Sequence, residues 1–213
     1  MVKRIKIGWD ISHMEFTIED HYYFSVLKKS IREAGAVVRE LDSLGGIANF
    51  DVLVINYPEK PFKKTEAKLV RDFLKSGKKV IVGGYYKNED RIADHINSLS
   101  SHFGLLLNKD EVRDRFSNDE GDDLLIVTSR VLSYNDSVER VLLPCSASIS
   151  ILDSSVRPII YKEKSGSRGE KVLGAESRID GGRFLLLGTC VFWDNFAIKK
   201  YSNFRFSLNL LLG

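Results

Sequence analysis

The stretch Lys79-Val-Ile-Val-Gly-Gly-Tyr-Tyr-Lys-Asn-Glu-Asp90 decides the fold, because its apolar run stops abruptly at two glycines. A short apolar run bounded in this way predicts a buried parallel strand, followed by a tight turn and a crossover. In α/β proteins, ligands bind in the crevice at the carboxyl ends of such strands. The turn at Gly83, Gly84 and Tyr85 therefore marks the place where a functional site is expected.

Strand and helix patterns alternate on both sides of this stretch. Extended apolar patterns predict strands at residues 4–8, 37–41 and 51–55. Apolar residues three and four apart predict a helix at residues 19–34. They predict two more at 65–76, with Thr65 as its N-cap, and after Asn88, which can cap the third helix. Such alternation predicts a mainly parallel central sheet with helices on both faces.

The second half of the chain has a different pattern. Extended runs joined by turns predict an antiparallel β segment over about residues 124–180, added at one edge of the main sheet. Residues 183–188 then predict another buried strand, and residues 203–212 predict a closing helix that buries Phe204, Phe206, Leu208 and Leu211. Because no Pro-rich or low-complexity linker interrupts the chain, residues 1–213 are expected to form a single domain.

The composition excludes several classes of protein. Hydrophobic residues make up 43% and charged residues 29% of the chain, a balance typical of globular proteins. The net charge of +3 comes from 32 basic and 29 acidic residues that are mixed along the chain, so nucleic-acid binding is not expected. No apolar run approaches the roughly 20 residues of a membrane span, and no signal peptide is recognisable. Two cysteines without metal-type spacing, Cys145 and Cys190, complete the prediction of a cytoplasmic protein.

Several short stretches carry a family resemblance. They are Asp10-Ile-Ser-His13, Asp51-Val-Leu-Val-Ile-Asn-Tyr-Pro58, Val80-Ile-Val-Gly-Gly84, Gly182-Arg-Phe-Leu-Leu-Leu-Gly188 and the segment 192–195. In them the chain resembles the class I glutamine amidotransferase-like superfamily. Within it, the likeness is to the non-catalytic branch found in gliding-motility and ABC-transporter accessory proteins and in the amino-terminal domain of an intraflagellar-transport subunit. The resemblance implies an α/β fold of the flavodoxin-like or amidotransferase-like kind, a three-layer sandwich. The chain departs from the family at Thr189, where an Asp often follows the glycine.

The residues of an amidotransferase triad are missing. Such an enzyme needs a cysteine in the turn between strand and helix, where backbone donors lower its pKa, and a histidine from later in the chain. The turn here carries Gly84 and Tyr85 instead. All four histidines precede residue 103. The sequence therefore predicts no catalytic residues of that kind.

Two other chemistries remain open. Cys190 follows the last strand and could act as a hydrolase nucleophile with His13, or with a carboxylate such as Asp10 or Asp194; the alternative is a buried and inert thiol. Asp10, His13 and His21 are of metal-ligating types, but their spacing matches no recognised motif. Neither a metal nor any other cofactor is expected.

Asp10 and the two glycines each allow two interpretations. Asp10 can bind a ligand at the end of the first strand, or it can accept backbone hydrogen bonds within its own loop. Gly83 and Gly84 could admit a phosphate, but no phosphate-binding spacing is present, so a turn that requires a positive φ is the preferred explanation.

The predicted function is a non-catalytic binding or scaffolding module with its ligand at the carboxyl-end crevice. The ligand would be a protein partner or a small molecule, sugar-like molecules included, because the loops there are rich in Tyr, Trp and Asn. The candidate ligand-binding residues are Asp10, Ser12, His13, Asn56, Gly83, Gly84, Tyr85, Thr189, Cys190, Trp193 and Asp194.

Overall fold

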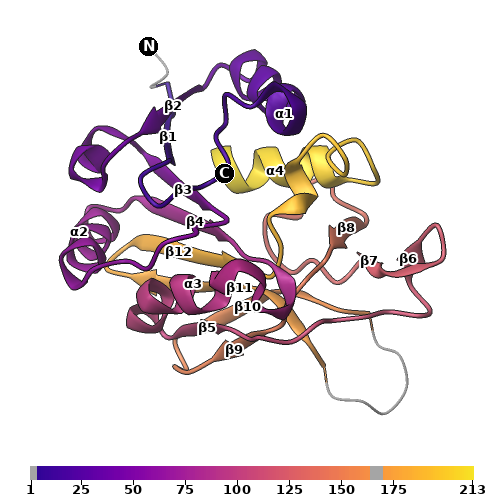
Figure 1. Cartoon of the computed structure of the whole chain (residues 1–213). Coiled ribbons are helices and arrows are strands. Elements are labelled where there is room, and N and C mark those ends of the chain that lie inside the picture. The colour runs from indigo at the N-terminus through magenta and orange to yellow at the C-terminus, as the bar shows by residue number, and fades with distance from the viewer. Residues whose placement is uncertain (1–3, 164–169) are drawn as a thin grey trace.

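A seven-stranded sheet forms the centre of the computed structural model, which describes residues 4–163 and 170–213 (Figure 1). Its strand order is β10-β11-β12-β4-β3-β1-β2. The seven strands are β1 (Lys6–Asp10), β2 (Val37–Leu41), β3 (Val52–Asn56), β4 (Lys79–Gly83), β10 (Arg157–Tyr161), β11 (Val172–Ile179) and β12 (Gly182–Leu187). Neighbours from β12 to β2 run parallel, and β11 is antiparallel to both of its neighbours. The predicted α/β fold with a mainly parallel sheet is confirmed.

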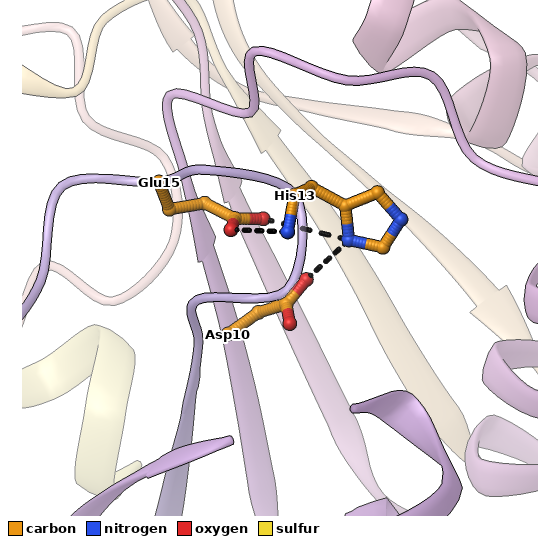
Figure 2. A group of neighbouring side chains, drawn as sticks. All are labelled: Asp10, His13 and Glu15. Carbon is orange, nitrogen blue, oxygen red and sulfur yellow. Dashed lines mark hydrogen bonds and ion pairs between the residues drawn. The ribbon is translucent and has the colours of Figure 1, made fainter. Parts of the chain in front are cut away.

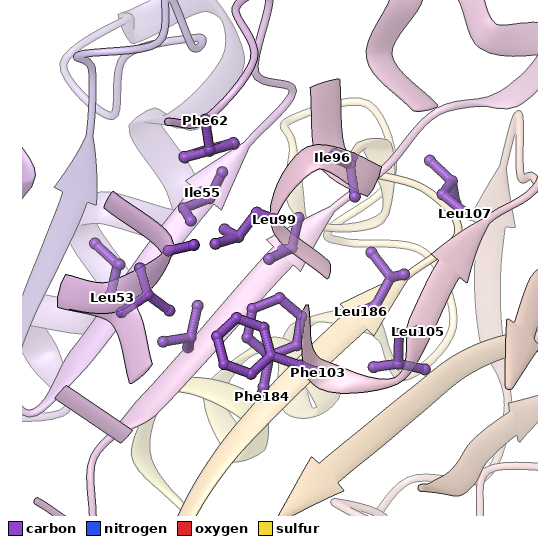
Figure 3. Close-up of a cluster of buried hydrophobic side chains, with 14 of the residues drawn as sticks. Leu53, Ile55, Phe62, Ile96, Leu99, Phe103, Leu105, Leu107, Phe184 and Leu186 are labelled. Atoms are coloured by element: carbon purple, nitrogen blue, oxygen red, sulfur yellow. The ribbon is translucent and has the colours of Figure 1, made fainter. Parts of the chain in front are cut away.

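Helices cover both faces of this sheet (Figure 1). The four α-helices are α1 (His21–Glu33), α2 (Lys64–Lys75), α3 (Ile92–Ser100) and α4 (Asn203–Leu212). Side chains of α2 and α3 belong to one buried apolar cluster, and side chains of α1 and α4 belong to another. In the first cluster the rings of Phe103 and Phe184 stack with their centroids 4.5 Å apart (Figure 3). The sheet thus lies between two cores, as in a three-layer sandwich.

Strand β4 occupies the middle of the sheet and all five of its residues are buried. Val80 and Val82 belong to the cluster under α2 and α3, whereas Ile81 belongs to the cluster under α1 and α4. Successive side chains of a strand point to opposite faces, so an unbroken apolar run is what a strand covered on both sides requires. The prediction of a central parallel strand at this position is confirmed.

Lys79 anchors β4 to the carboxyl end of α4. Its Nζ donates to Leu210 O at 2.8 Å and also to Gly213 O. Burial, together with the charge of Arg183, lowers the pKa of Lys79 to about 7. A cation at the end of α4 also faces the negative end of the helix dipole.

The antiparallel segment is only partly at the sheet edge. The edge position is confirmed for β10 and β11, but the other strands form two small sheets of their own, β5-β9 and β6-β7-β8. These strands are β5 (Leu105–Leu107), β6 (Asn118–Asp119), β7 (Asp122–Thr128), β8 (Val141–Pro144) and β9 (Ile149–Ile151). The link between β8 and β9 crosses the end of β12, where Ala147 N donates to Gly188 O at 2.9 Å. A segment held across the strand ends cannot also lie along the sheet edge.

Two predicted helix caps are wrong in detail. Helix α2 begins at Lys64, one residue before Thr65, and Lys63 N donates to Glu66 Oε2 at 2.7 Å. Residues Tyr86–Arg91 form an irregular 3₁₀ segment, so α3 begins only at Ile92. Asn88 nevertheless accepts a hydrogen bond from Asp94 N at 3.1 Å and satisfies one donor of the first turn.

The closing helix is confirmed, but its buried face is not the predicted one throughout. Phe206 and Leu211 are fully buried, whereas Phe204 is 42% exposed and Leu208 is partly exposed. Asn203 is buried instead, where its amide donates to Leu142 O and Phe192 O, both at 2.8 Å. Within the described residues, none of the helices has the length and apolar character that a membrane span requires.

The explanation predicted for Gly83 and Gly84 is wrong, because neither residue has a positive φ. Both are needed for close approach instead. A Cβ on Gly84 would lie 2.7 Å from Leu107 Cδ2 and 2.9 Å from Leu187 O. A Cβ on Gly83 would lie 3.0 Å from both Asn56 Oδ1 and Cys190 Cβ. The ends of β3, β4 and β12 therefore converge more tightly than side chains would allow.

We expect Gly84→Ala to lower the free energy of unfolding by about 1 to 3 kcal/mol, because the new methyl group must displace backbone as well as a leucine side chain. Gly45→Ala is the matched control, since its Cβ would meet only Ser43 Oγ at 3.5 Å. Urea denaturation of both variants measures the difference. Equal stabilities would contradict the close-approach explanation.

Candidate functional site

A pocket of about 320 Å³ opens at the carboxyl ends of the central strands. We call it the carboxyl-end pocket. It is lined by Phe16, Tyr23, Phe24, Asn56, Tyr57, Tyr85, Glu89, Cys190, Val191 and Asp194. Its volume lies at the lower end of the range for small-molecule sites.

A larger hollow of about 870 Å³ lies elsewhere, along α1 and the amino end of β2. Its lining includes the basic residues Arg4, Lys28, Lys29 and Arg32. The carboxyl-end pocket is the better candidate site, because it lies where parallel sheets bind ligands and because its lining combines aromatic rings with a few polar groups.

Aromatic rings form a continuous wall of the pocket. The centroid of Phe16 lies 5.2 Å from that of Tyr23 and 5.2 Å from that of Tyr57. Tyr57 in turn lies 5.3 Å from Tyr85, edge to face. Phe16 and Tyr23 are about one-third exposed, whereas Tyr57 is buried and its hydroxyl donates to Asp90 Oδ2 at 2.8 Å. The pocket therefore offers flat apolar faces with a rigid backing.

Asn56, the last residue of β3, is the most informative polar group of the pocket. It is 1% exposed, and its Oδ1 accepts a hydrogen bond from Trp193 Nε1 at 3.0 Å. Its Nδ2 is buried and has no hydrogen-bond partner within residues 4–163 and 170–213. A buried donor of this kind costs free energy unless an acceptor reaches it.

Asp194 supplies a carboxylate to the same pocket lining. Its Oδ1 accepts backbone hydrogen bonds from Phe196 N at 2.9 Å and Ala197 N at 3.1 Å. Burial outweighs these bonds and raises the pKa of Asp194 to about 6. The pocket thus contains a carboxyl group that changes charge near neutral pH.

The structure does not favour Cys190 as a nucleophile. The thiol is buried, and burial together with the charge of Asp194 raises its pKa far above the ordinary value. His13 is not among the residues that line the pocket beside Cys190. The two residues follow β1 and β12, which are separated in the sheet by β3 and β4. Three strand spacings of about 4.8 Å place those strand ends roughly 14 Å apart.

Asp10, the last residue of β1, and His13, in the loop that follows, belong to a separate buried cluster together with Glu15 (Figure 2). Asp10 Oδ2 lies 2.8 Å from His13 Nδ1. Although burial raises the pKa of Asp10, its hydrogen bonds with His13 and Ser12 hold it below the ordinary value. Burial and the charge of Asp10 raise the pKa of Glu15 well above its usual range. His21 is absent from this cluster.

The predicted site residues thus fall into three groups. Asn56, Tyr85, Cys190 and Asp194 line the carboxyl-end pocket. Asp10, Ser12 and His13 form the buried cluster with Glu15. The remaining four are buried and are not among the lining residues: Gly83, Gly84, Thr189 and Trp193.

Four lining residues escape prediction from the sequence: Phe16, Tyr23, Phe24 and Glu89. Tyr57 and Val191 also line the pocket, and they lie in the predicted carboxyl-end loops 56–58 and 189–195. Tyr57 follows Asn56 directly at the end of a predicted strand, which is a usable signal. Tyr23 lies on the apolar stripe of a predicted helix, where core packing is the natural interpretation, so only the fold reveals its place.

The fold and the place of the pocket define a class, the α/β proteins with a mainly parallel central sheet and a pocket at the carboxyl ends of its strands. The mmIFT52 N-terminal domain aligns with a TM-score of 0.79 at 18% identity, over 97% of this chain and 98% of that chain. A putative ThuA-like protein from Bacteroides uniformis ATCC 8492 aligns with a TM-score of 0.58 at 12% identity, over 97% and 89% of the two chains. A cold-adapted β-galactosidase from Rahnella sp. R3 aligns with a TM-score of 0.57 at 10% identity, over 97% of this chain and 30% of that chain. At such identities the likeness shows the fold alone, and the fold class predicted from the sequence, α/β with a mainly parallel central sheet, agrees with it.

The family itself is shown by a closer relative. No family model matches the chain. An uncharacterized protein of Aquifex aeolicus (strain VF5) is 46% identical over 226 residues, which cover 97% of this chain and 93% of that protein. The chain belongs to the same family as this Aquifex aeolicus protein.

The pKa of Asp194 predicts a pH dependence of stability. Between the ordinary value of 3.8 and about 6, the folded state holds a proton that the unfolded state has released. The contribution of Asp194 to the free energy of unfolding is therefore greatest near pH 4. It falls by about 2 to 3 kcal/mol as the pH rises to about 6. Asp194→Asn, which keeps an acceptor for Phe196 N and Ala197 N, removes this loss.

Urea denaturation at pH 4.5 and pH 7.5 gives the change in unfolding free energy between the two pH values. The effect is the difference between this change in the wild type and in Asp194→Asn. Asp42→Asn, at an exposed position, serves as the control. A wild type and an Asp194→Asn variant that change in parallel would show that Asp194 is not the group concerned.

Proposed function

We propose that the chain is a non-catalytic binding module whose ligand occupies the carboxyl-end pocket, and that residues 1–213 act as one domain. The ligand class we infer is a small hydroxylated molecule such as a hexose. The cytoplasm is the proposed location, because a reducing compartment suits two free cysteines.

The unpaired Nδ2 of Asn56 is the observation that carries this proposal. A ligand oxygen would supply the acceptor that this buried amide lacks. Asp194 and Glu89 add carboxylate acceptors to the same lining, so a ligand that both donates and accepts suits the site. Hydroxyl groups do both.

The aromatic wall supports the same ligand class. Phe16 and Tyr23 keep part of their rings accessible, and the half-buried ring of Tyr85 meets Tyr57 edge to face. A sugar ring presents apolar C–H groups on one face and hydroxyls around its edge, which suits a pocket of flat rings and few polar groups. The volume of about 320 Å³ is enough for one such ring.

We expect the wild type to bind a simple hexose, and Tyr23→Ala to weaken that binding about tenfold, since one stacked ring contributes about 1 kcal/mol or more. Tyr22→Ala is the matched control, because Tyr22 is 78% exposed and is not part of the pocket lining. Glucose, galactose and mannose serve as probes in saturation-transfer NMR and calorimetry. Absence of binding by all three, or equal losses in the two variants, would refute the hexose assignment.

The non-catalytic part of the proposal has its own test. We expect Cys190 in the folded protein to resist iodoacetamide at pH 7, because its thiol is buried and its pKa is raised. The measurement is the labelling rate by mass spectrometry, with the urea-unfolded protein as the reactive reference. Fast labelling of native Cys190 would instead support the hydrolase alternative.

A protein partner is the second candidate ligand, and exposed aromatic and apolar side chains within two residues of the pocket lining favour it. Tyr22, Phe196 and Met14 are 78%, 55% and 54% exposed. Asn195 ties Phe196 to α1, because its Nδ2 donates to Tyr22 O at 2.6 Å. A surface of this kind suits a recognition interface. The variant Tyr22→Ala distinguishes the two candidate ligands, because it would weaken protein docking but leave hexose binding unchanged.

A further inference from the structure

Three side chains, from the end of β1 and the loop that follows it, turn polar atoms toward one another. Asp10 Oδ2 lies 2.8 Å from His13 Nδ1, and His13 Nδ1 lies 3.7 Å from Glu15 Oε1 (Figure 2). One ligand atom from each of the three residues falls within 4.8 Å of the other two. All three residues are buried.

The opposite atom of each side chain is already held by the protein. Asp10 Oδ1 accepts from Ser12 N at 3.0 Å and Ser12 Oγ at 2.7 Å. Glu15 Oε2 accepts from His13 N at 2.8 Å. His13 Nε2 faces Glu66 Oε2 at 3.4 Å, and the imidazole stacks on Phe62 with centroids 3.9 Å apart. The three inward atoms are therefore presented in fixed positions.

A second and independent observation concerns Glu15. Its side chain is completely buried, and its Oε1, the oxygen that faces His13, has no hydrogen-bond partner among the described residues. An unpartnered buried carboxylate oxygen is costly, because carboxylates lose strong hydration when they are buried. A cation or a hydrogen-bond donor beside Glu15 Oε1 would offset this cost.

We propose that Asp10, His13 and Glu15 form a binding site for a divalent first-row transition-metal ion of the Zn²⁺ class. Zn²⁺ binds imidazole nitrogen and carboxylate oxygen at about 2.0 to 2.2 Å, which in a tetrahedral arrangement sets these atoms roughly 3.4 Å apart. The separations of 2.8 and 3.7 Å bracket that value. Two carboxylates would neutralise the charge of the ion, and one coordination position is left for water.

The outer contacts have the form that metal sites use. A metal-bound histidine usually donates its second N–H to a carboxylate or carbonyl, which fixes the tautomer, and Glu66 stands in that place. The site was not expected from the sequence, since the spacing of Asp10 and His13 fits no known motif and Glu15 is not singled out by it.

The role that follows is structural. Phe16, which lines the carboxyl-end pocket, comes directly after Glu15, and its carbonyl accepts from Trp9 Nε1 at 2.8 Å. His13 O also accepts from Glu59 N at 2.9 Å, so the loop contacts the segment after β3. An ion at this place would lock the loop that presents Phe16. The proposal stands independently of the ligand inferred for the pocket.

The test is metal loading of the tag-free full chain. After incubation with ZnCl₂ and dialysis, we expect elemental analysis to find close to one Zn²⁺ per wild-type chain, with Tm raised by about 5 °C under near-saturating Zn²⁺. Glu15→Gln removes the inward carboxylate and is expected to lose the bound ion and the Tm shift. Glu19→Gln, at an exposed site close in sequence, is expected to match the wild type.

Two outcomes would overturn the proposal: wild-type protein that retains no zinc, or equal zinc in wild type and Glu15→Gln. X-ray absorption of zinc-loaded wild type gives an answer even where Glu15→Gln does not fold. Nitrogen and oxygen scatterers with one imidazole are expected, whereas a sulfur ligand would place the ion at a cysteine and refute the site.

Discussion

The convergence of three strand ends at Gly83 and Gly84 is the constraint on which the rest of the structure depends. Gly84 N donates to Leu187 O at 2.9 Å, and Tyr57 N donates to Gly83 O at 3.2 Å, so the chain at the end of β4 is held between the ends of β3 and β12. A side chain at either glycine would collide with these neighbours. The same close approach brings Asn56, Tyr85 and Cys190 to one pocket, and it leaves no room for a nucleophile on the turn itself.

The end of β1 and the loop after it contribute side chains to two different places, the buried cluster of Asp10, His13 and Glu15 and the carboxyl-end pocket. Asp10, His13 and Glu15 turn inward against Phe62 and the start of α2, whereas Phe16 turns toward the carboxyl-end pocket. Polar chemistry is thereby separated from the aromatic wall. The separation also explains why a Cys–His pair does not assemble. His13 contacts the carboxylates of Asp10 and Glu66. Cys190 follows β12, which β3 and β4 separate from β1.

Much of the fold could be predicted because it rests on local patterns. The periodicity of α1 and the apolar runs of β3 and β4 follow directly from burial on one face or on two. The site was only partly predictable. Asn56, Tyr85 and Asp194 follow strands closely enough to be expected at the carboxyl ends, but Tyr23 looks like a core residue until α1 is seen beside the pocket. Nothing in the sequence identifies Glu15 as a buried site residue, since a single glutamate in a loop is ordinarily exposed.

The sequence by itself determined the alternation of strands and helices, the lack of a nucleophile at Gly84 and the lack of a histidine after His102. These are properties of residue identity and short-range periodicity, which need no partner to be recognised. Only the tertiary structure decided that β12 enters the middle of the sheet beside β4, and that β1 therefore ends far from Cys190. Strand order depends on packing between segments distant in sequence, and local pattern does not encode it. The close approach at Gly83 and Gly84, and with it the pocket, is a product of that order.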